Sequence, residues 1–192
     1  MEPTIETSEE RQLIQSAQDG DRQAFCRLFQ LYRRPVFRSL LPLVGNREDA
    51  MDITQDAFVR AHRAIRRFDT ERPFFPWIYR IARNLGMTLL RKRQASENSI
   101  RLDDHEPGES PFEIADEGAD PRRESSDRQL EQLLLETLNT LNAQDREILV
   151  LRDLEERSYR EIAEALDIPQ GTVMSRLYYA RERLRKKMEA YL

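Results

Sequence analysis

Hydrophobic positions three and four residues apart recur through the N-terminal half of the chain and predict a series of amphipathic helices between about residues 9 and 93. Breaks at Gly20-Asp21 and Gly45-Asn46 separate the first three helices, and Asp21 is a predicted N-cap. Pro35 is expected to bend the second helix into its continuation. The fourth helix is expected to follow a loop and to run to Arg93, because proline is tolerated in a first helical turn.

The C-terminal third, roughly residues 128–192, shows the same period. Its leucines predict one helix over residues 130–141 and its next apolar stripe a second over 148–154. Ser158 can cap a short third helix, and Asp167-Ile168-Pro169 can form a tight turn into a longer fourth one. Two helices joined in this way are a helix-turn-helix, with a simple helical hairpin as the alternative.

Residues 96–127 lack any sustained period and contain three prolines, two glycines and many acids, which predicts a flexible, self-repelling linker. We therefore expect an all-α protein of two small helical domains, at residues 1–95 and 128–192. A flexible acidic linker would join them, and the C-terminal domain would contain the helix-turn-helix.

Charge is distributed very unevenly behind a net value of −4. Residues 60–93 carry ten basic and two acidic side chains, whereas residues 94–127 carry three and eleven. Such asymmetry indicates a nucleic-acid partner for the first of these segments.

The segment from Phe68 to Arg93 also holds the only tryptophan and four other aromatic residues. Its helix would bury one apolar face and present Arg80, Asn84, Met87 and Arg91 on the other. Arginines neutralise phosphates and aromatic rings stack on unpaired bases, so the pattern suits DNA with exposed bases. An ordinary surface helix with solvated arginines is the alternative for this segment taken alone.

Little in the sequence indicates an enzyme. His62 and His105 are isolated, so we predict no metal site and no cofactor, and we find no nucleophile with a partner base or Gly-rich phosphate loop. Cys26 falls in an apolar pattern and is expected to be a packed core thiol in a reducing compartment. Without a signal-peptide or membrane-spanning run, we expect a cytoplasmic protein.

Four segments in order carry a family resemblance: GDRQAFCRLFQLY, DITQDAFVRAHRAIRRF, PFFPWIYRIARNLGMTLLRKR and LNAQDREILVLRDLEERSYREIAEALDIPQGTVMSRLYYARERLRKK. With them the chain resembles bacterial RNA polymerase sigma factors of the extracytoplasmic-function (ECF) group, which keep only the second and fourth conserved sigma regions. The resemblance implies a non-enzymatic subunit whose residues 1–95 bind core polymerase and read and melt the −10 element. The helix-turn-helix would read the −35 element.

The resemblance also implies roles for individual residues of the first domain. The residues expected to dock on the clamp helices of the polymerase β′ subunit are Asp52, Gln55, Asp56 and Phe58. The residues expected at the −10 DNA are Phe68, Trp77, Arg80, Arg83, Asn84 and Arg91. Asn84 and the loop of residues 68–76 would capture a base turned out of the duplex, while Trp77 could equally be core packing.

For the helix-turn-helix, the residues expected at the −35 DNA are Gln170, Thr172, Ser175, Arg176, Tyr179 and Arg183. Arg176 is the strongest candidate, for a guanine or a phosphate. Met174 and Tyr179 stand where some family members carry arginine, so the −35 sequence of those members does not transfer directly.

The implied partners are core RNA polymerase, through its β′ clamp helices and β flap, promoter DNA, and a cognate anti-sigma factor, which is often membrane-anchored. The linker would thread the polymerase RNA path, with a plain spacer as the alternative. A helix-turn-helix regulator that never joins polymerase is the competing function, but it predicts a ligand, receiver or dimerisation domain that residues 1–95 do not show.

Overall fold

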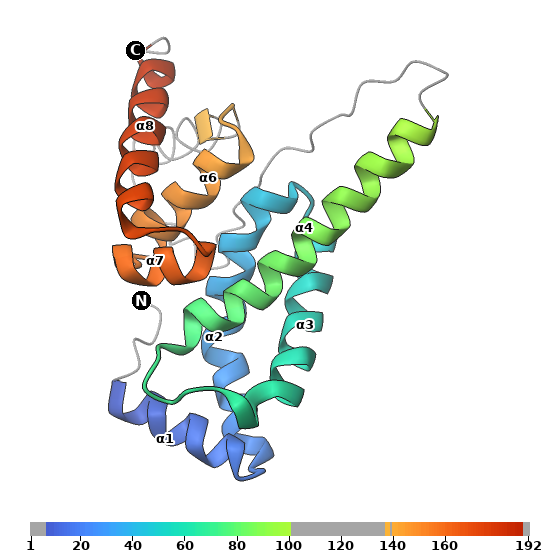
Figure 1. Cartoon of the computed structure of the whole chain (residues 1–192), viewed down its shortest axis with the longest axis vertical. Coiled ribbons are helices and arrows are strands. Elements are labelled where there is room, and N and C mark those ends of the chain that lie inside the picture. The colour runs from blue at the N-terminus through green and yellow to red at the C-terminus, as the bar shows by residue number, and fades with distance from the viewer. Residues whose placement is uncertain (1–6, 101–136, 139, 190–192) are drawn as a thin grey trace, which may run out of the picture.

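The structure is a computed structural model that describes residues 7–100, 137–138 and 140–189. All elements in these ranges are helical (Figure 1), which confirms the all-α class for the described residues. The elements are α1 (Thr7–Gln18), α2 (Arg22–Val44), α3 (Arg47–Ala64), η1 (Ile65–Arg67), α4 (Phe74–Ile100), α6 (Ala143–Leu149), η2 (Val150–Leu154), α7 (Tyr159–Leu166) and α8 (Gln170–Met188).

The linker prediction is largely outside the described residues. Helix α4 continues to Ile100, past the expected start of the linker at residue 96, and residues 101–127 are not described. The leucine stripe expected over residues 130–141 is described only at its end, where Leu138 and Leu141 are buried. Among the described helices, none is long and apolar enough to cross a membrane.

Helix ends in the first lobe, residues 7–100, follow local capping chemistry. Asp21 Oδ1 accepts hydrogen bonds from the backbone N–H groups of Gln23 at 2.8 Å and Ala24 at 3.3 Å, which confirms the predicted N-cap. Gly45 ends α2 in the left-handed conformation, with φ of 73°. Pro35 lies inside α2, which is one helix across it.

The core of the first lobe forms where α2, α3 and α4 pack together. The close crossing of α2 and α4 requires Gly86, because a Cβ there would lie 3.2 Å from Val44 Cγ2 and 3.3 Å from Leu40 Cδ1. Cys26 is exposed, so the expectation of a core thiol was wrong. The buried face of α2 passes through its neighbours Ala24, Phe25 and Leu28 instead.

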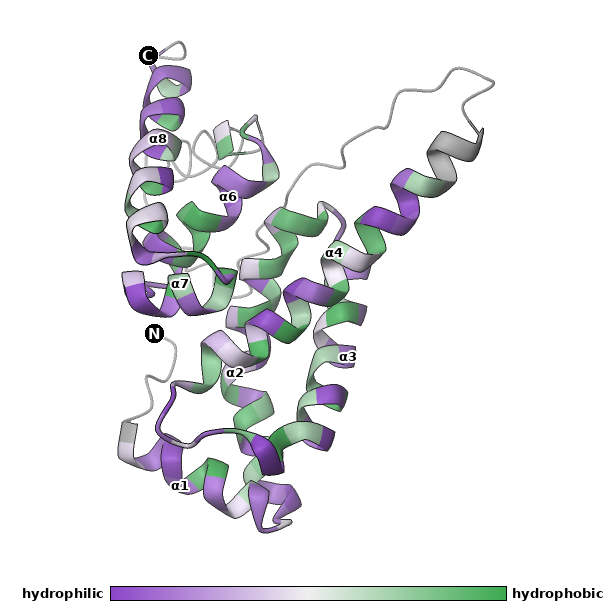
Figure 2. Cartoon of the chain, viewed as in Figure 1, coloured by the Kyte–Doolittle hydropathy of each residue, from purple (hydrophilic) through white to green (hydrophobic). Residues whose placement is uncertain are grey.

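The second lobe, residues 137–138 and 140–189, contains the predicted helix-turn-helix. Ser158 and Glu161 form a reciprocal capping box at the start of α7, and Asp167 ends α7 with φ of 58°. In α8, Val173, Leu177 and Ala180 are buried, as their spacing predicted. Hydropathy differs between the helices (Figure 2): the C-terminal part of α2 is largely hydrophobic, whereas α8 is mostly hydrophilic.

The two lobes pack against each other. Helix α7 lies against α4 and α6 lies against α2 (Figure 1). One hydrophobic core runs from Ile14 in α1 to Ala180 in α8, and Leu41, Ala50 and Val150 make a second apolar contact between the lobes. The sequence predicted two lobes but gave no indication of this shared core.

Candidate nucleic-acid interface

An aromatic cluster stands at the start of α4. The Trp77 ring centroid lies 4.6 Å from that of Phe68 and 5.5 Å from that of Phe74. Phe68 and Phe74 are buried, and Trp77 is partly buried against the core. Trp77 therefore fixes the entrance of α4 by packing, and part of its surface still faces solvent.

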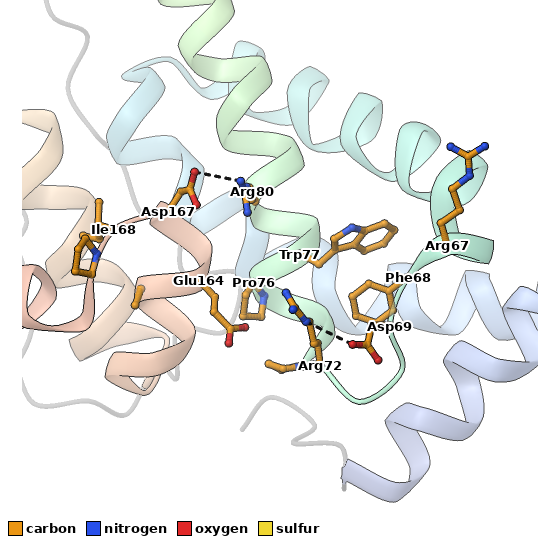
Figure 3. A pocket seen from close by; sticks show the side chains of 13 residues that line it. Arg67, Phe68, Asp69, Arg72, Pro76, Trp77, Arg80, Glu164, Asp167 and Ile168 are labelled. Atoms are coloured by element: carbon orange, nitrogen blue, oxygen red, sulfur yellow. Dashed lines mark hydrogen bonds and ion pairs between the residues drawn. The ribbon is translucent and has the colours of Figure 1, made fainter.

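A cavity of about 660 Å³ opens beside this cluster, between the loop before α4 and the helix-turn-helix (Figure 3). Trp77 and Arg80 line one side, and Glu164 and Asp167 line the other. Arg80 Nη2 lies 3.1 Å from Asp167 Oδ2, so the two sides are joined by an ion pair. The acids of the second lobe thus occupy the space next to a cationic helix.

Asn84 does not line this cavity. Its side chain is exposed farther along α4, on the same face as Arg80. The sequence placed Asn84 and the loop of residues 68–76 in one pocket, whereas the described cavity forms from the loop and α7 without it.

Glu147 of α6 is the centre of a buried polar network between the lobes. Its carboxylate is 2% exposed, and its Oε1 accepts hydrogen bonds from the Tyr79 hydroxyl at 2.7 Å and from Arg83 Nε at 3.0 Å. The Tyr79 hydroxyl also lies 2.9 Å from the carbonyl oxygen of Ser39. Burial raises the pKa of Glu147, while Arg83 opposes this rise.

The predicted −10 residues consequently fall into two groups. Asn84 and Arg91 are exposed, and Arg80 is exposed but paired with Asp167. Arg83 is held by Glu147, with only 20% of its side chain exposed, and Phe68 is in the core. In the packed arrangement, only part of the predicted face of α4 is open to DNA.

On α3, three of the four predicted polymerase contacts are exposed: Asp52, Gln55 and Asp56. Phe58 is only 3% exposed and packs edge-on against Phe29, so the structure corrects its predicted role as a surface anchor. Its place in the apolar spacing of α3 already indicated the core. The exposed apolar side chains on this helix are Met51 and Val59, which the sequence analysis did not select.

On α8, Gln170, Ser175 and Tyr179 are exposed, while Thr172 and Arg176 are half-buried. Arg183 makes two hydrogen bonds to the carboxylate of Asp145, at 2.5 and 2.7 Å, which makes it a structural link between α8 and α6 in this arrangement. Sequence reasoning did not select Met174 or Tyr178 as DNA contacts, although both are strongly exposed on α8. The sequence could have indicated their exposure, because each directly follows a residue of the buried stripe and so points away from that stripe.

No group of histidine, cysteine, aspartate and glutamate side chains among the described residues could hold a metal ion. What the described surface offers is an exposed amide and arginines on α4, and arginines and exposed aromatic rings on α8.

Comparison with known proteins gives matches to two family models and to full-length relatives of the same family. The family model of sigma-70 region 2 matches residues 28–96, and that of sigma-70 region 4 matches residues 131–184. The ECF RNA polymerase sigma-E factor of Haemophilus influenzae is 34% identical over 92% of this chain and 94% of its own length. The ECF sigma factor SigW of Bacillus subtilis is 32% identical over 91% and 94%.

Solved structures share the fold. CnrH in complex with the cytosolic domain of CnrY is 25% identical, with a TM-score of 0.67 over 95% of this chain and 98% of that one. RpoE of Bartonella quintana, solved with the anti-sigma factor NepR, is 23% identical, with a TM-score of 0.65 over 86% and 96%. The chain matches both sigma regions and is more than 30% identical to ECF factors over about nine tenths of its length. It therefore belongs to the ECF group of sigma-70 family sigma factors, non-enzymatic subunits that direct promoter-specific transcription initiation.

Proposed function

We propose that this chain reads and melts the −10 element with the outward face of α4 and reads the −35 element with α8. The observation that carries the first part is the exposure of Asn84 on a cationic helix whose start is fixed by the aromatic cluster. An asparagine amide can pair with the edge of a base, and unstacking that base costs a few kcal/mol. Arg80 and Arg91 would hold the phosphates on either side.

We propose that core polymerase binds the exposed face of α3. Asp52, Gln55 and Asp56 supply charge and hydrogen bonds there, and Met51 and Val59, 47% and 51% exposed, supply the apolar anchors that Phe58 does not. Apolar anchors within a polar rim are typical of helix-binding surfaces. The second lobe would contact the β flap.

The packed arrangement of the lobes would have to open for this function. Arg83 cannot contact a phosphate while it binds Glu147, and Glu164 and Asp167 would repel DNA from the cavity beside Trp77. We therefore propose that the lobes separate when the chain joins polymerase, so that each reaches its own promoter element.

Two structural relatives were solved with a protein partner: one with the cytosolic domain of CnrY and the other with the anti-sigma factor NepR. We propose by analogy that a cognate anti-sigma factor, membrane-anchored as the family resemblance implies, binds this chain in the cytoplasm. The acidic residues of 96–127 would enter the basic RNA path of polymerase once the lobes are apart.

The test is reconstitution with core polymerase. The purified chain is mixed with core enzyme and a genomic DNA library, and the 5′ ends of the transcripts are sequenced. We expect starts that share two upstream elements and that depend on the added chain. Absence of a complex with core and of such starts would refute the proposal, and duplex binding without core would favour an ordinary helix-turn-helix regulator.

A further inference from the structure

Large apolar side chains are exposed on the helix that is expected to enter the major groove. Six large hydrophobic side chains of the described residues are exposed, and three of them are on α8: Met174 at 55%, Tyr178 at 64% and Tyr179 at 57%. Their concentration on one helix of the helix-turn-helix indicates a contact surface.

Helical geometry places Met174 and Tyr178 side by side. They are four residues apart and directly follow Val173 and Leu177, whose side chains are buried. The Tyr178 ring is also braced by Tyr179, with ring centroids 5.4 Å apart and planes at 78°. The two side chains therefore form one apolar strip on the solvent side of α8, with the exposed hydroxyl of Ser175 next to it.

Three arginines of α8 that could compete for bases are paired with acids instead. Arg181 pairs with Asp153 at 2.5 Å, Arg183 pairs with Asp145, and Arg185 pairs with Glu182 at 3.1 Å. Arg176 is half-buried on the opposite flank, where its charge slightly opposes the rise that burial causes in the pKa of Glu147. The outward middle of α8 thus presents apolar surface rather than guanidinium groups.

Only one apolar group lies on the major-groove edges of the four base pairs, the C5-methyl of thymine. We propose that Met174 and Tyr178 each pack on a thymine methyl and so set the base preference of this chain at two positions of the −35 element. The inference rests on the proposed −35 role of α8 and names what that helix reads.

The spacing of the two thymines follows from helix dimensions. Four residues of α-helix rise about 6 Å, and stacked base pairs are about 3.4 Å apart. Met174 and Tyr178 should therefore read base pairs about two steps apart when α8 lies along the groove. We therefore expect a thymine at each of the two positions. Neither a thymine at one position only nor cytosine at both positions is expected.

The experiment uses the holoenzyme, made from core polymerase and the full chain, on a promoter identified by the transcript selection above. Each −35 thymine is replaced in turn by deoxyuridine, which pairs identically but lacks the methyl group. We expect two positions at which this replacement weakens wild-type binding about three- to tenfold. Met174→Ala should abolish the effect at one position and Tyr178→Ala at the other.

Leu154→Ala is the matched control, because Leu154 is 45% exposed but lies on η2 rather than α8. It should keep the full sensitivity to deoxyuridine at both positions. Wild-type binding that is indifferent to every replacement would overturn the inference, as would variants that lose affinity equally for thymine and deoxyuridine. Failure of the proposed function is a distinct result, since no promoter-dependent start would appear at all.

Discussion

Asn84 has an exposed side chain, whereas its two nearest arginine neighbours on α4, Arg80 and Arg83, are each bound to an acid of the second lobe. The exposed Asn84 amide is hydrated by solvent and carries no charge that would attract an acid of the second lobe. Its hydrogen-bond donor and acceptor therefore remain available for a base. Asn84, like the exposed Arg91, could thus act without any change in the protein.

Replacing Asn84 by alanine should impair open-complex formation at the cognate −10 element by about 1–3 kcal/mol, because one side-chain pair with a base is lost. Affinity for core polymerase should not change. Permanganate footprinting and a core-binding titration measure the two quantities. Gln94→Ala is the control, an exposed polar side chain on the same helix, and equal losses of melting and core binding would contradict the pocket assignment.

Arg183 shows how an apparently DNA-facing arginine can instead stabilise the fold. Asp145 is 5% exposed and would lose its charged partner if Arg183 were removed. Arg183→Ala should therefore lower the free energy of unfolding by about 1–2 kcal/mol. The exposed Lys186, replaced by alanine, should change it by less than about 0.5 kcal/mol.

Urea unfolding followed by circular dichroism compares these two variants. If Arg183→Ala instead unfolds like Lys186→Ala but reduces the salt dependence of −35 binding, the arginine contacts phosphate and its link to Asp145 contributes little.

At the scale of the helix, most of the first lobe was predictable because its signals are local. The cap at Asp21, the break at Gly45 and the stripe of α3 each depend on residues within one or two turns. The same logic failed where a residue had two plausible roles: Phe58 was assigned to both the core and a partner, and packing against Phe29 decides for the core.

Gly86 lies where α2 and α4 cross. Among the described glycines, it is the one at which an added Cβ would crowd a neighbouring side chain. Gly86→Val should destabilise the chain by about 1–3 kcal/mol, because branched carbons would meet Val44 and Leu40 at a site where even a Cβ is tight. Gly171→Val is the matched control in α8, since a Cβ there meets nothing within 4 Å. Equal urea midpoints for both variants would show that α2 and α4 can move apart at little cost.

At the scale of the molecule, the sequence could not predict how the lobes meet. Glu147 contacts Arg83 and Tyr79, which are 64 and 68 residues away, and no periodic pattern reports a pairing at that separation. From the sequence, the charged side chains of α6 would be placed on a solvent-exposed face, yet the Glu147 carboxylate is buried. The cost of burying it is offset only by its partners on α4, so the network depends on both lobes.

Glu147→Lys should open the free chain, because it places an ammonium group beside Arg83 and removes the acceptor for Tyr79. The exposed Cys26 and a second cysteine at the exposed Lys186 can carry a fluorescent donor and acceptor, one on each lobe. We expect energy transfer to fall in Glu147→Lys while the helical circular dichroism is kept. Glu156→Lys, at an exposed position of the same lobe, should leave the transfer unchanged.

Two milder variants separate opening from unfolding. Tyr79→Phe removes a single hydroxyl and should weaken closure by about 1 kcal/mol, giving an intermediate transfer. Glu147→Gln keeps an oxygen acceptor for Tyr79 and Arg83 without the charge, and it should stay closest to wild type. If all three variants transfer energy as the wild type does, the buried network does not hold the lobes together, and the shared apolar core must do so alone.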